Sequence, residues 1–447
     1  SELALRADNA GMTISGPVRV GTVPATVQWQ QAFGPGNGGR STISGEVELS
    51  QRFADEFNIG LPSGTLSGAT TADVTINLQR DSPPVFTLSS GLAGLGLQLP
   101  ALGWRKAAES GGDLHVDGTL GPVPDISALT IDAGGLRAQG AIGISATGGL
   151  EAARFSRVQL GDWLDAPVIL RGRGAGRPAQ VVVAGGLLDL RSADFGDSAG
   201  QGGPMEIALN TLQISEGIAL TDFRGEFDSA GGFSGGFSAR VNGGAAVQGT
   251  VVPSRGRSAV RIVSNDAGGV FRAAGLLRNA RGGEMDLTLL PAGAEGSYDG
   301  TLAATNLRVR DAPALAGLLN AISVVGLLQQ LDGQGLSFSN VDAQFRITPD
   351  RIIITQSSAV GPGLGLSLDG VYRIADRNMD FQGVVSPIYL LNGIGSFLTR
   401  PGEGFIGFNF TLRGPVDSAR VAVNPLSALT PGMFREIFRR PPPQVGQ

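Results

Sequence analysis

Residues 341–347 read Val-Asp-Ala-Gln-Phe-Arg-Ile, so every second side chain in this stretch is apolar. A two-residue period of this kind predicts a β-strand with one apolar face and one polar face. The same alternation occurs in residues 73–78, 113–120 and 408–413. Short segments rich in glycine, proline, asparagine and aspartate separate such stretches, which predicts tight turns between antiparallel neighbours.

The composition favours a large β-structure with an excess of apolar surface. Glycine supplies 70 of the 447 residues, more than twice its usual share of about 7%. No three-residue glycine period is present, so a collagen-like chain is excluded and many tight turns are expected. Charged residues make up 16% of the chain, against about 25% in typical soluble domains. There is room for roughly 25–30 strands, which at about 4.8 Å each predicts an elongated groove or solenoid.

The segment between Asp311 and Asp332 contains twenty residues without a charge. It predicts a helix over about 312–331, with Asp311 as N-cap and Gly333 just past its end. A membrane span would have this length, but Asn320, Gln329, Gln330 and Pro313 and the lack of a flanking positive cluster disfavour it. We expect the helix to be buried on a sheet or to line an apolar groove. Its groove-facing or membrane-facing residues would be Leu315, Leu318, Leu319, Ile322, Val325 and Leu328.

Two further helices are predicted, over about 389–399 and 431–440. The second places an apolar face opposite arginines, which is typical of a docking or interfacial helix. A helix that caps the end of the sheet is an equally good interpretation. Its apolar face consists of Met433, Phe434, Ile437 and Phe438. Residues 441–447 begin with three prolines and are predicted to form a disordered tail.

No pattern in the sequence points to catalysis. Cysteine is absent, which excludes thiolate chemistry and cysteine metal sites. His115 is the only histidine and lies on the polar side of a predicted strand without clustered carboxylates. The glycine-rich segments 172–176 and 361–365 lack the lysine and the helix of a phosphate loop. Net charge is −5 with no dense basic stripe, which argues against a nucleic-acid partner. We therefore predict no enzymatic activity, no catalytic or metal-binding residues and no cofactor.

The C-terminal third resembles a known family. The run Leu-Arg-Gly-Pro-Val-Asp at 412–417, followed by residues 421–438, is similar to the C-terminal signature of AsmA-like proteins, and most of all to the YhdP-type members. The strand pair at 370–374 and 379–383, and the apolar segment before it, are similar to that family as well. Residues 99–106 resemble a linker-like motif of its central region.

The resemblance implies a protein of the Gram-negative cell envelope. Such proteins are anchored in the inner membrane by an N-terminal helix, cross the periplasm, and are thought to carry phospholipids between inner and outer membranes, which supports outer-membrane biogenesis. Their β-sheet is long and curled into a taco-like hydrophobic groove, with a few short helices near the C-terminus. This sequence begins at Ser1 without an anchor, so we expect a fragment of a longer chain. The expected partners are phospholipids and the two membranes or their proteins.

By this interpretation residues 1–230 form a repeating β-groove region, 231–440 the AsmA-like C-terminal region and 441–447 the tail. The lining would come from the apolar positions of the alternating strands. These are Val74, Ile76, Leu78, Leu114, Val116, Phe345, Ile347, Met379, Phe381, Phe408, Phe410 and Leu412.

Three other classes remain open. The main alternative is a non-enzymatic envelope scaffold or assembly protein with a closed β-rich core. A carbohydrate-active β-helix enzyme is disfavoured by only three tryptophans and three tyrosines. An outer-membrane barrel is disfavoured by the predicted terminal helix.

Overall fold

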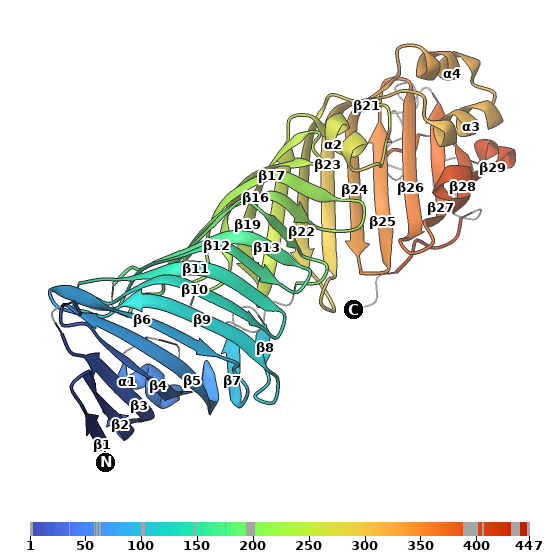
Figure 1. Cartoon of the computed structure of the whole chain (residues 1–447). Helices are drawn as coiled ribbons and strands as arrows, with labels where there is room; N and C mark the ends of the chain where they lie inside the picture. Colours follow the sequence, from blue (N-terminus) through green and yellow to red (C-terminus); the bar gives the residue numbers. More distant parts are fainter. Residues whose placement is uncertain are drawn as a thin grey trace. The chain divides into compact units, whose positions relative to one another are not determined.

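The computed structural model describes residues 3–34, 36–57, 59, 61, 64–99, 103–146, 149–174, 176–193, 202–387, 401–404, 406–430 and 439–444. The described chain is mostly β, with strands joined into large sheet structure and four short α-helices (Figure 1). The predicted β-rich class is therefore confirmed. By compactness the chain divides into two units, one of residues 1–215 with 224–231 and one of residues 216–223 with 232–447.

In the first unit, strands that follow one another in the sequence lie side by side and pair antiparallel from β1 to β13. The bounds are β1 (Ala4–Ala7), β2 (Gly11–Val20), β3 (Val23–Ala32), β4 (Ser41–Ser50), β5 (Leu66–Gln79), β6 (Ser82–Ser90), β9 (Gly112–Thr119), β10 (Asp125–Ala133), β11 (Leu136–Ile144), β12 (Leu150–Leu160) and β13 (Leu164–Arg171). Between β6 and β9 the chain adds β7 (Leu95–Leu99), which pairs with the start of β5, and β8 (Trp104–Lys106), which pairs with β7.

The prediction of a wholly antiparallel sheet is wrong at one place. Strands β14 (Gln180–Ala184) and β15 (Leu187–Asp189) pair antiparallel with β13 but parallel with β16 (Pro204–Gln213). The sheet is therefore mixed. For the parallel pairing, the chain must return to the starting end of the preceding strand before β16 begins. The connection 190–203 is long enough for this return, since parallel neighbours need a connection of a dozen or more residues. Strand β17 (Ala219–Asp228) has residues in both units.

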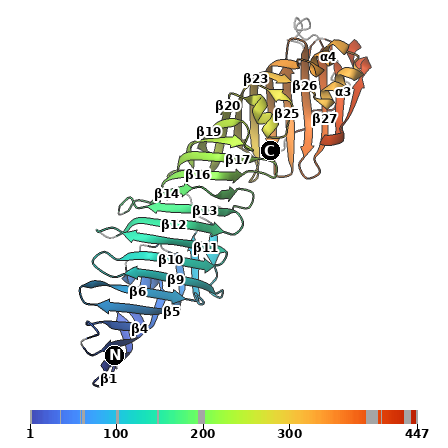
Figure 2. The ribbon, with the colours of Figure 1, turned by 45° about the horizontal axis from the view of Figure 1, so that its top comes forward.

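In the second unit the strands again pair antiparallel in sequence order, as Figure 2 lets the reader follow. The bounds are β18 (Ser234–Val241), β19 (Ala246–Ser254), β20 (Arg257–Ser264), β22 (Glu284–Pro291), β23 (Tyr298–Val309), β24 (Leu336–Ile347), β25 (Arg351–Val360), β26 (Leu364–Arg373), β27 (Asn378–Pro387), β28 (Phe408–Pro415) and β29 (Arg420–Asn424). The short β21 (Ala280–Arg281) adds to β23 beside β22.

Both units place their insertions at one end of the strands. In the first unit α1 (Gln51–Glu56) joins β4 to β5, and β7 with β8 joins β6 to β9. In the second, α2 (Ala267–Ala273) joins β20 to β22, and α3 (Pro313–Ala321) with α4 (Val325–Asp332) joins β23 to β24. Antiparallel order makes all of these strand ends lie along one edge of their unit, here named the insert edge. The opposite edge has short turns, such as 255–256 and 348–350, and is named the turn edge.

The single helix predicted over 312–331 is wrong, because the structure has two short helices there. Helix α3 ends at Ala321 and α4 begins at Val325, with Ser323 between them at φ +57°. The β-branched residues at the break are poor helix formers, and the bend lets Leu319 and Leu331 both reach 0% exposure. The N-cap is Ala312, without the side-chain hydrogen bond expected of Asp311.

The remaining helix predictions either differ from the structure or fall on residues outside its described part. Helix α1 lies outside the C-terminal region where short helices were expected, and α2 lies inside that region at a position where no helix was predicted. The helix predicted over 389–399 and residues 431–438, with Met433, Phe434, Ile437 and Phe438, lie outside the described residues, as do 445–447 of the predicted tail. No helix in the described part of the chain has the length and apolar character to cross a bilayer.

The only lysine of the chain fixes the β7–β8 insertion in place. Lys106 is 2% exposed, and its ammonium donates to the carbonyl oxygens of Leu92 (2.8 Å), Leu95 (2.9 Å), Ala107 (3.1 Å) and Ser110 (2.5 Å). Burial lowers the pKa of this amine below its ordinary value. Four loop carbonyls therefore obtain their hydrogen bonds from one side chain.

We expect Lys106→Met to lower the free energy of unfolding by about 3 kcal/mol, because buried carbonyls lose their donor. Urea denaturation followed by the fluorescence of Trp104 and Trp163, which pack in one core cluster, measures the change. Arg105→Met is the control, since Arg105 is exposed. Equal midpoints for the two variants would contradict this role of Lys106.

A buried ion cluster attaches the C-terminal residues to the second unit. Arg439 is paired with Glu403 at 2.5 Å and with Asp369, and the three side chains are 5%, 4% and 2% exposed. Burial opposes the charge of Arg439, but the two carboxylates outweigh it and raise its pKa above the ordinary value. Ser367 donates to Glu403 (2.7 Å), and Gln382 donates to Asp369 (2.9 Å). The cluster lies on the face of β26 and β27 that the sequence pattern marks as polar.

Replacing Arg439 by methionine should cost about 3–5 kcal/mol of unfolding free energy, because two carboxylates are left buried without a cation. Arg440→Met should cost less than about 1 kcal/mol, since the Arg440–Asp380 pair is half-exposed. Thermal denaturation of both variants, with limited proteolysis of the C-terminus, gives the comparison. Similar losses in the two variants would rule out a special contribution of the buried cluster.

Candidate functional site

The register of the second unit aligns apolar positions into one row that crosses its strands. Each member is the direct cross-strand partner of the next, so all lie on the same face. From β19 to β29 the row consists of Val251, Val260, Leu289, Gly300, Phe345, Ile354, Gly370, Phe381, Leu412 and Val421. We call the surface that carries this row the apolar face of the second unit.

The first unit has an equivalent apolar face with two rows. One consists of Ile14, Trp29, Ile43, Ile76, Phe86, Gly118, Ile126 and Ile142. The other consists of Gly45, Val74, Leu88, Val116, Leu129, Gly140, Phe155, Val168, Val183 and Ile207. The opposite face carries polar partners, such as Thr87, which donates to Asp117 at 2.7 Å.

The residues named as groove-lining from the sequence lie on these faces. Val74, Ile76, Val116, Phe345, Phe381 and Leu412 are members of the rows above. Leu78 and Leu114 alternate with row members in β5 and β9. Ile347 and Met379 belong to a neighbouring row through Ile352 and Tyr372, and Phe408 and Phe410 pair with Val385 and Gly383.

Burial on the apolar faces changes along each strand. In β26, Leu364 near the insert edge is 2% exposed, whereas Tyr372 on the same face toward the turn edge is half-buried. In β4, Val47 and Leu49 are buried and Ile43 is half-buried. The apolar face is therefore closed at the insert edge and partly open to solvent toward the turn edge.

The insertions account for the closed edge. In the first unit Phe53 of α1 packs against a buried cluster with Val23, Val47 and Leu49, and Trp104 of β8 packs with Leu136 and Leu160. In the second unit α3 packs against β29 (Figure 1). Leu318 and Leu319 of α3 are buried, Leu315, Ile322 and Leu328 are half-buried, and Val325 is exposed. The two helices thus cover the edge of the apolar face and do not fill its open part.

Phenylalanine rings lie over glycines of the neighbouring strand at six positions among the described residues. In every case the two residues are direct cross-strand partners, and a Cβ on the glycine would come within 2.1–2.8 Å of a ring atom. The pairs are Phe86–Gly118, Phe155–Gly140, Phe237–Gly249, Phe345–Gly300, Phe381–Gly370 and Phe410–Gly383. Each ring fills the space above a glycine, which keeps the apolar face level and covers a backbone that lacks a side chain.

Sequence reasoning missed these pairs and the closed insert edge. The phenylalanines and glycines are visible in the sequence, and Phe345 and Gly300 are 45 positions apart in its numbering. Only the strand register brings them together, and register is a long-range property. The glycine excess could have suggested close approach, but not its partner.

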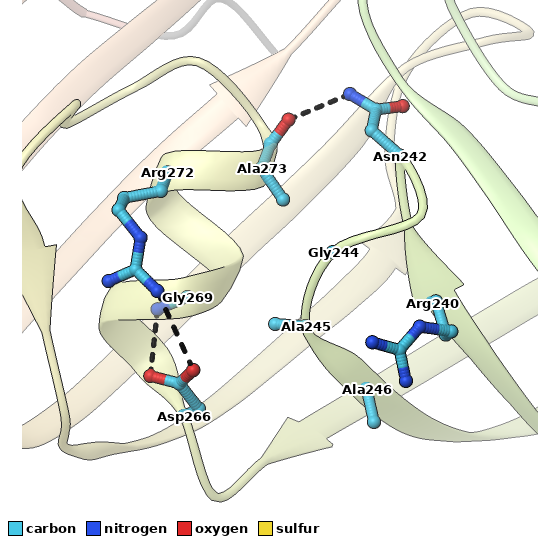
Figure 3. Close-up of a pocket in the computed structure, with 9 residues that line it drawn as sticks. All are labelled: Arg240, Asn242, Gly244, Ala245, Ala246, Asp266, Gly269, Arg272 and Ala273. Atoms are coloured by element: carbon cyan, nitrogen blue, oxygen red, sulfur yellow. Dashed lines mark hydrogen bonds and ion pairs between the residues drawn. The ribbon is translucent and has the colours of Figure 1, made fainter.

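A polar hollow of the second unit lies beside α2 and has a volume of about 580 Å³ (Figure 3). Its polar groups bond mainly to one another. Asp266 accepts from the backbone N–H of Gly269 (2.8 Å) and lies 3.9 Å from Arg272, while Asn242 donates to the carbonyl of Ala273 (2.8 Å). These bonds cap α2 and join it to the β18–β19 turn, which is a structural role.

His115 is half-exposed and lies 3.1 Å from Asp117 on the polar face, where the Thr87 hydroxyl lowers the pKa of Asp117. Within the described ranges no three histidine or acidic side chains gather closely enough to hold a metal ion. The chain matches no protein-family model, no curated protein and no solved structure.

The ring-over-glycine arrangement can be tested in the β18–β19 hairpin. A Cβ on Gly249 would lie 2.1 Å from Cζ of Phe237, whereas a Cβ on Gly236 would meet nothing closer than 3.7 Å. We expect Gly249→Ala to lower the unfolding free energy by about 1–3 kcal/mol and Gly236→Ala to change it by less than about 0.5 kcal/mol. Urea denaturation provides both values.

Adding Phe237→Leu to Gly249→Ala should recover part of the lost stability, because the smaller side chain gives way to the new methyl group. Equal stability of the two alanine variants would show that the ring does not depend on the glycine.

Proposed function

We propose that this protein is an AsmA-like lipid-transfer protein whose apolar faces form a taco-like hydrophobic groove for phospholipid acyl chains. The observation that supports it is the half-buried state of most of the row residues between the insert edge and the turn edge. A protein whose β-sheets close on each other would bury these mid-strand side chains, as an ordinary core does. Apolar rows that remain partly open are suited to an apolar ligand.

The physical basis of transfer is solvation. Each CH₂ of an acyl chain costs about 0.8 kcal/mol when it is exposed to water, so a desorbed phospholipid is strongly penalised. Rows of valine, leucine, isoleucine and phenylalanine would remove most of that cost. Because rings lie over glycines, the surface offers few deep pockets that would hold one lipid in place. Weak, uniform binding along a face favours movement over storage.

The two edges suggest how a lipid would be oriented. Buried side chains and insertions occupy the insert edge, so acyl chains would lie on the open part of the face. The headgroup would then be at the turn edge, where it stays hydrated. In this proposal the protein is non-enzymatic and acts in the periplasm between the inner and outer membranes, in support of outer-membrane biogenesis.

A charge on the apolar face should impair transfer more than folding. We expect Ile76→Glu to slow phospholipid transfer between donor and acceptor vesicles by about tenfold, because an acyl chain would have to pass a buried charge. Asn77→Glu, the next residue on the opposite face, should transfer at close to the wild-type rate. A fluorescent phospholipid assay measures both variants, with denaturation curves to compare their stability. Wild-type transfer by a folded Ile76→Glu protein would contradict the mechanism.

Lipid extraction from the purified protein distinguishes the lipid-transfer proposal from the scaffold alternative. Mass spectrometry of extracts from detergent-free preparations should find several phospholipids per chain. A stable, monodisperse and lipid-free protein would favour a scaffold whose apolar faces are closed in solution.

A further inference from the structure

Three arginines on the polar face of the second unit are each matched with a carboxylate near the turn edge. Arg346 pairs with Asp299 at 2.7 Å, Arg351 with Asp350 at 2.6 Å, and Arg373 with Asp376 at 2.9 Å. Each of these arginines has an acidic partner of its own, so the charges balance locally.

The last strands depart from this balance. Asp380 of β27 accepts from both Arg413 (3.0 Å) and Arg440 (2.8 Å). Hydrogen bonds from Arg440 and Arg413 hold the pKa of Asp380 below its ordinary value, so it remains ionised and committed to them. Arg420 of β29 is exposed and is the direct cross-strand partner of Arg413. Like charges placed opposite each other in a sheet are destabilising.

A hollow of about 450 Å³ lies between these two arginines. It is lined by Arg413, Gly414, Pro415, Ser418 and Arg420, without a carboxylate among the described side chains. Gly414 has φ +110°, a conformation that favours glycine. Ser418 is exposed, so its hydroxyl can serve as a further donor. Among the described side chains no carboxylate is paired with Arg420.

We propose that Arg413 and Arg420 form a binding site for a phosphate group. Two guanidinium groups that line one hollow match the oxygens of a phosphate, and arginine binds such groups in a bidentate manner. A bound dianion or monoanion would also relieve the repulsion between the paired arginines. The proposed phosphate site is independent of the proposed lipid groove. Arg413 and Arg420 lie on the face opposite Leu412 and Val421, which belong to the apolar row.

The phosphate can belong to free inorganic phosphate or to the headgroup of an anionic membrane lipid, and the same chemistry serves both. Inorganic phosphate is tested by calorimetric titration and by its effect on the melting temperature. The membrane source is tested by sedimentation with vesicles of phosphatidylglycerol and phosphatidylcholine in equal parts, against vesicles of phosphatidylcholine alone. The protein in all experiments is the full 447-residue chain.

Arg420→Gln should weaken the binding of whichever probe the wild-type protein binds by about tenfold or more. The same change should slightly stabilise the unliganded protein, because it removes the positive charge opposite Arg413. Arg255→Gln is the matched control, since Arg255 is an exposed turn-edge arginine and its loss changes the net charge equally. It should leave binding of the same probe near the wild-type value.

A loss restricted to the phosphate titration assigns the site to a free phosphate, and a loss restricted to the anionic vesicles assigns it to a headgroup. The proposal is overturned if the wild-type protein binds neither probe. It is also overturned if Arg255→Gln weakens binding as much as Arg420→Gln, because attraction would then follow net charge alone.

Discussion

The structure depends on the two-residue period of its strands, which places most of the large apolar side chains of each unit on one face. A sheet of this kind must cover that face or present it to something apolar. Here the insertions cover one edge, through α1, β7 with β8, and the α3–α4 pair, and most row residues beyond them remain half-buried.

Much of the local structure could be read from the sequence. The alternation at 341–347 predicts a strand, and β24 spans Leu336–Ile347. The mainly antiparallel order follows from short turns. The parallel β16 and the break in the apolar helix could not be read so directly. Composition suggested one helix, but the burial of Leu319 and Leu331 decided the geometry, and burial is a tertiary property that overrides local preference.

The two buried cations show another limit of sequence reasoning. Lys106 and Arg439 look like surface residues in the sequence, yet they are 2% and 5% exposed. One is surrounded by carbonyl oxygens and the other by two carboxylates. Each holds an irregular segment against a regular sheet, because a buried charge cannot be released without great cost. Their partners lie on loops and distant strands whose positions the sequence pattern does not specify. The apolar candidate residues were accessible to prediction because alternation alone defines their face.

The placement of all insertions on one edge has a consequence for how such a chain can change in length. In an antiparallel order, adding a single strand would reverse the direction of every later strand and carry the following insertions to the opposite edge. Adding a hairpin of two strands leaves both edges as they were. Addition of strands in pairs therefore keeps the insertions on the same edge. A single added strand keeps them there only with a long connection that returns the chain to the starting end of the strand, such as the connection 190–203 before β16.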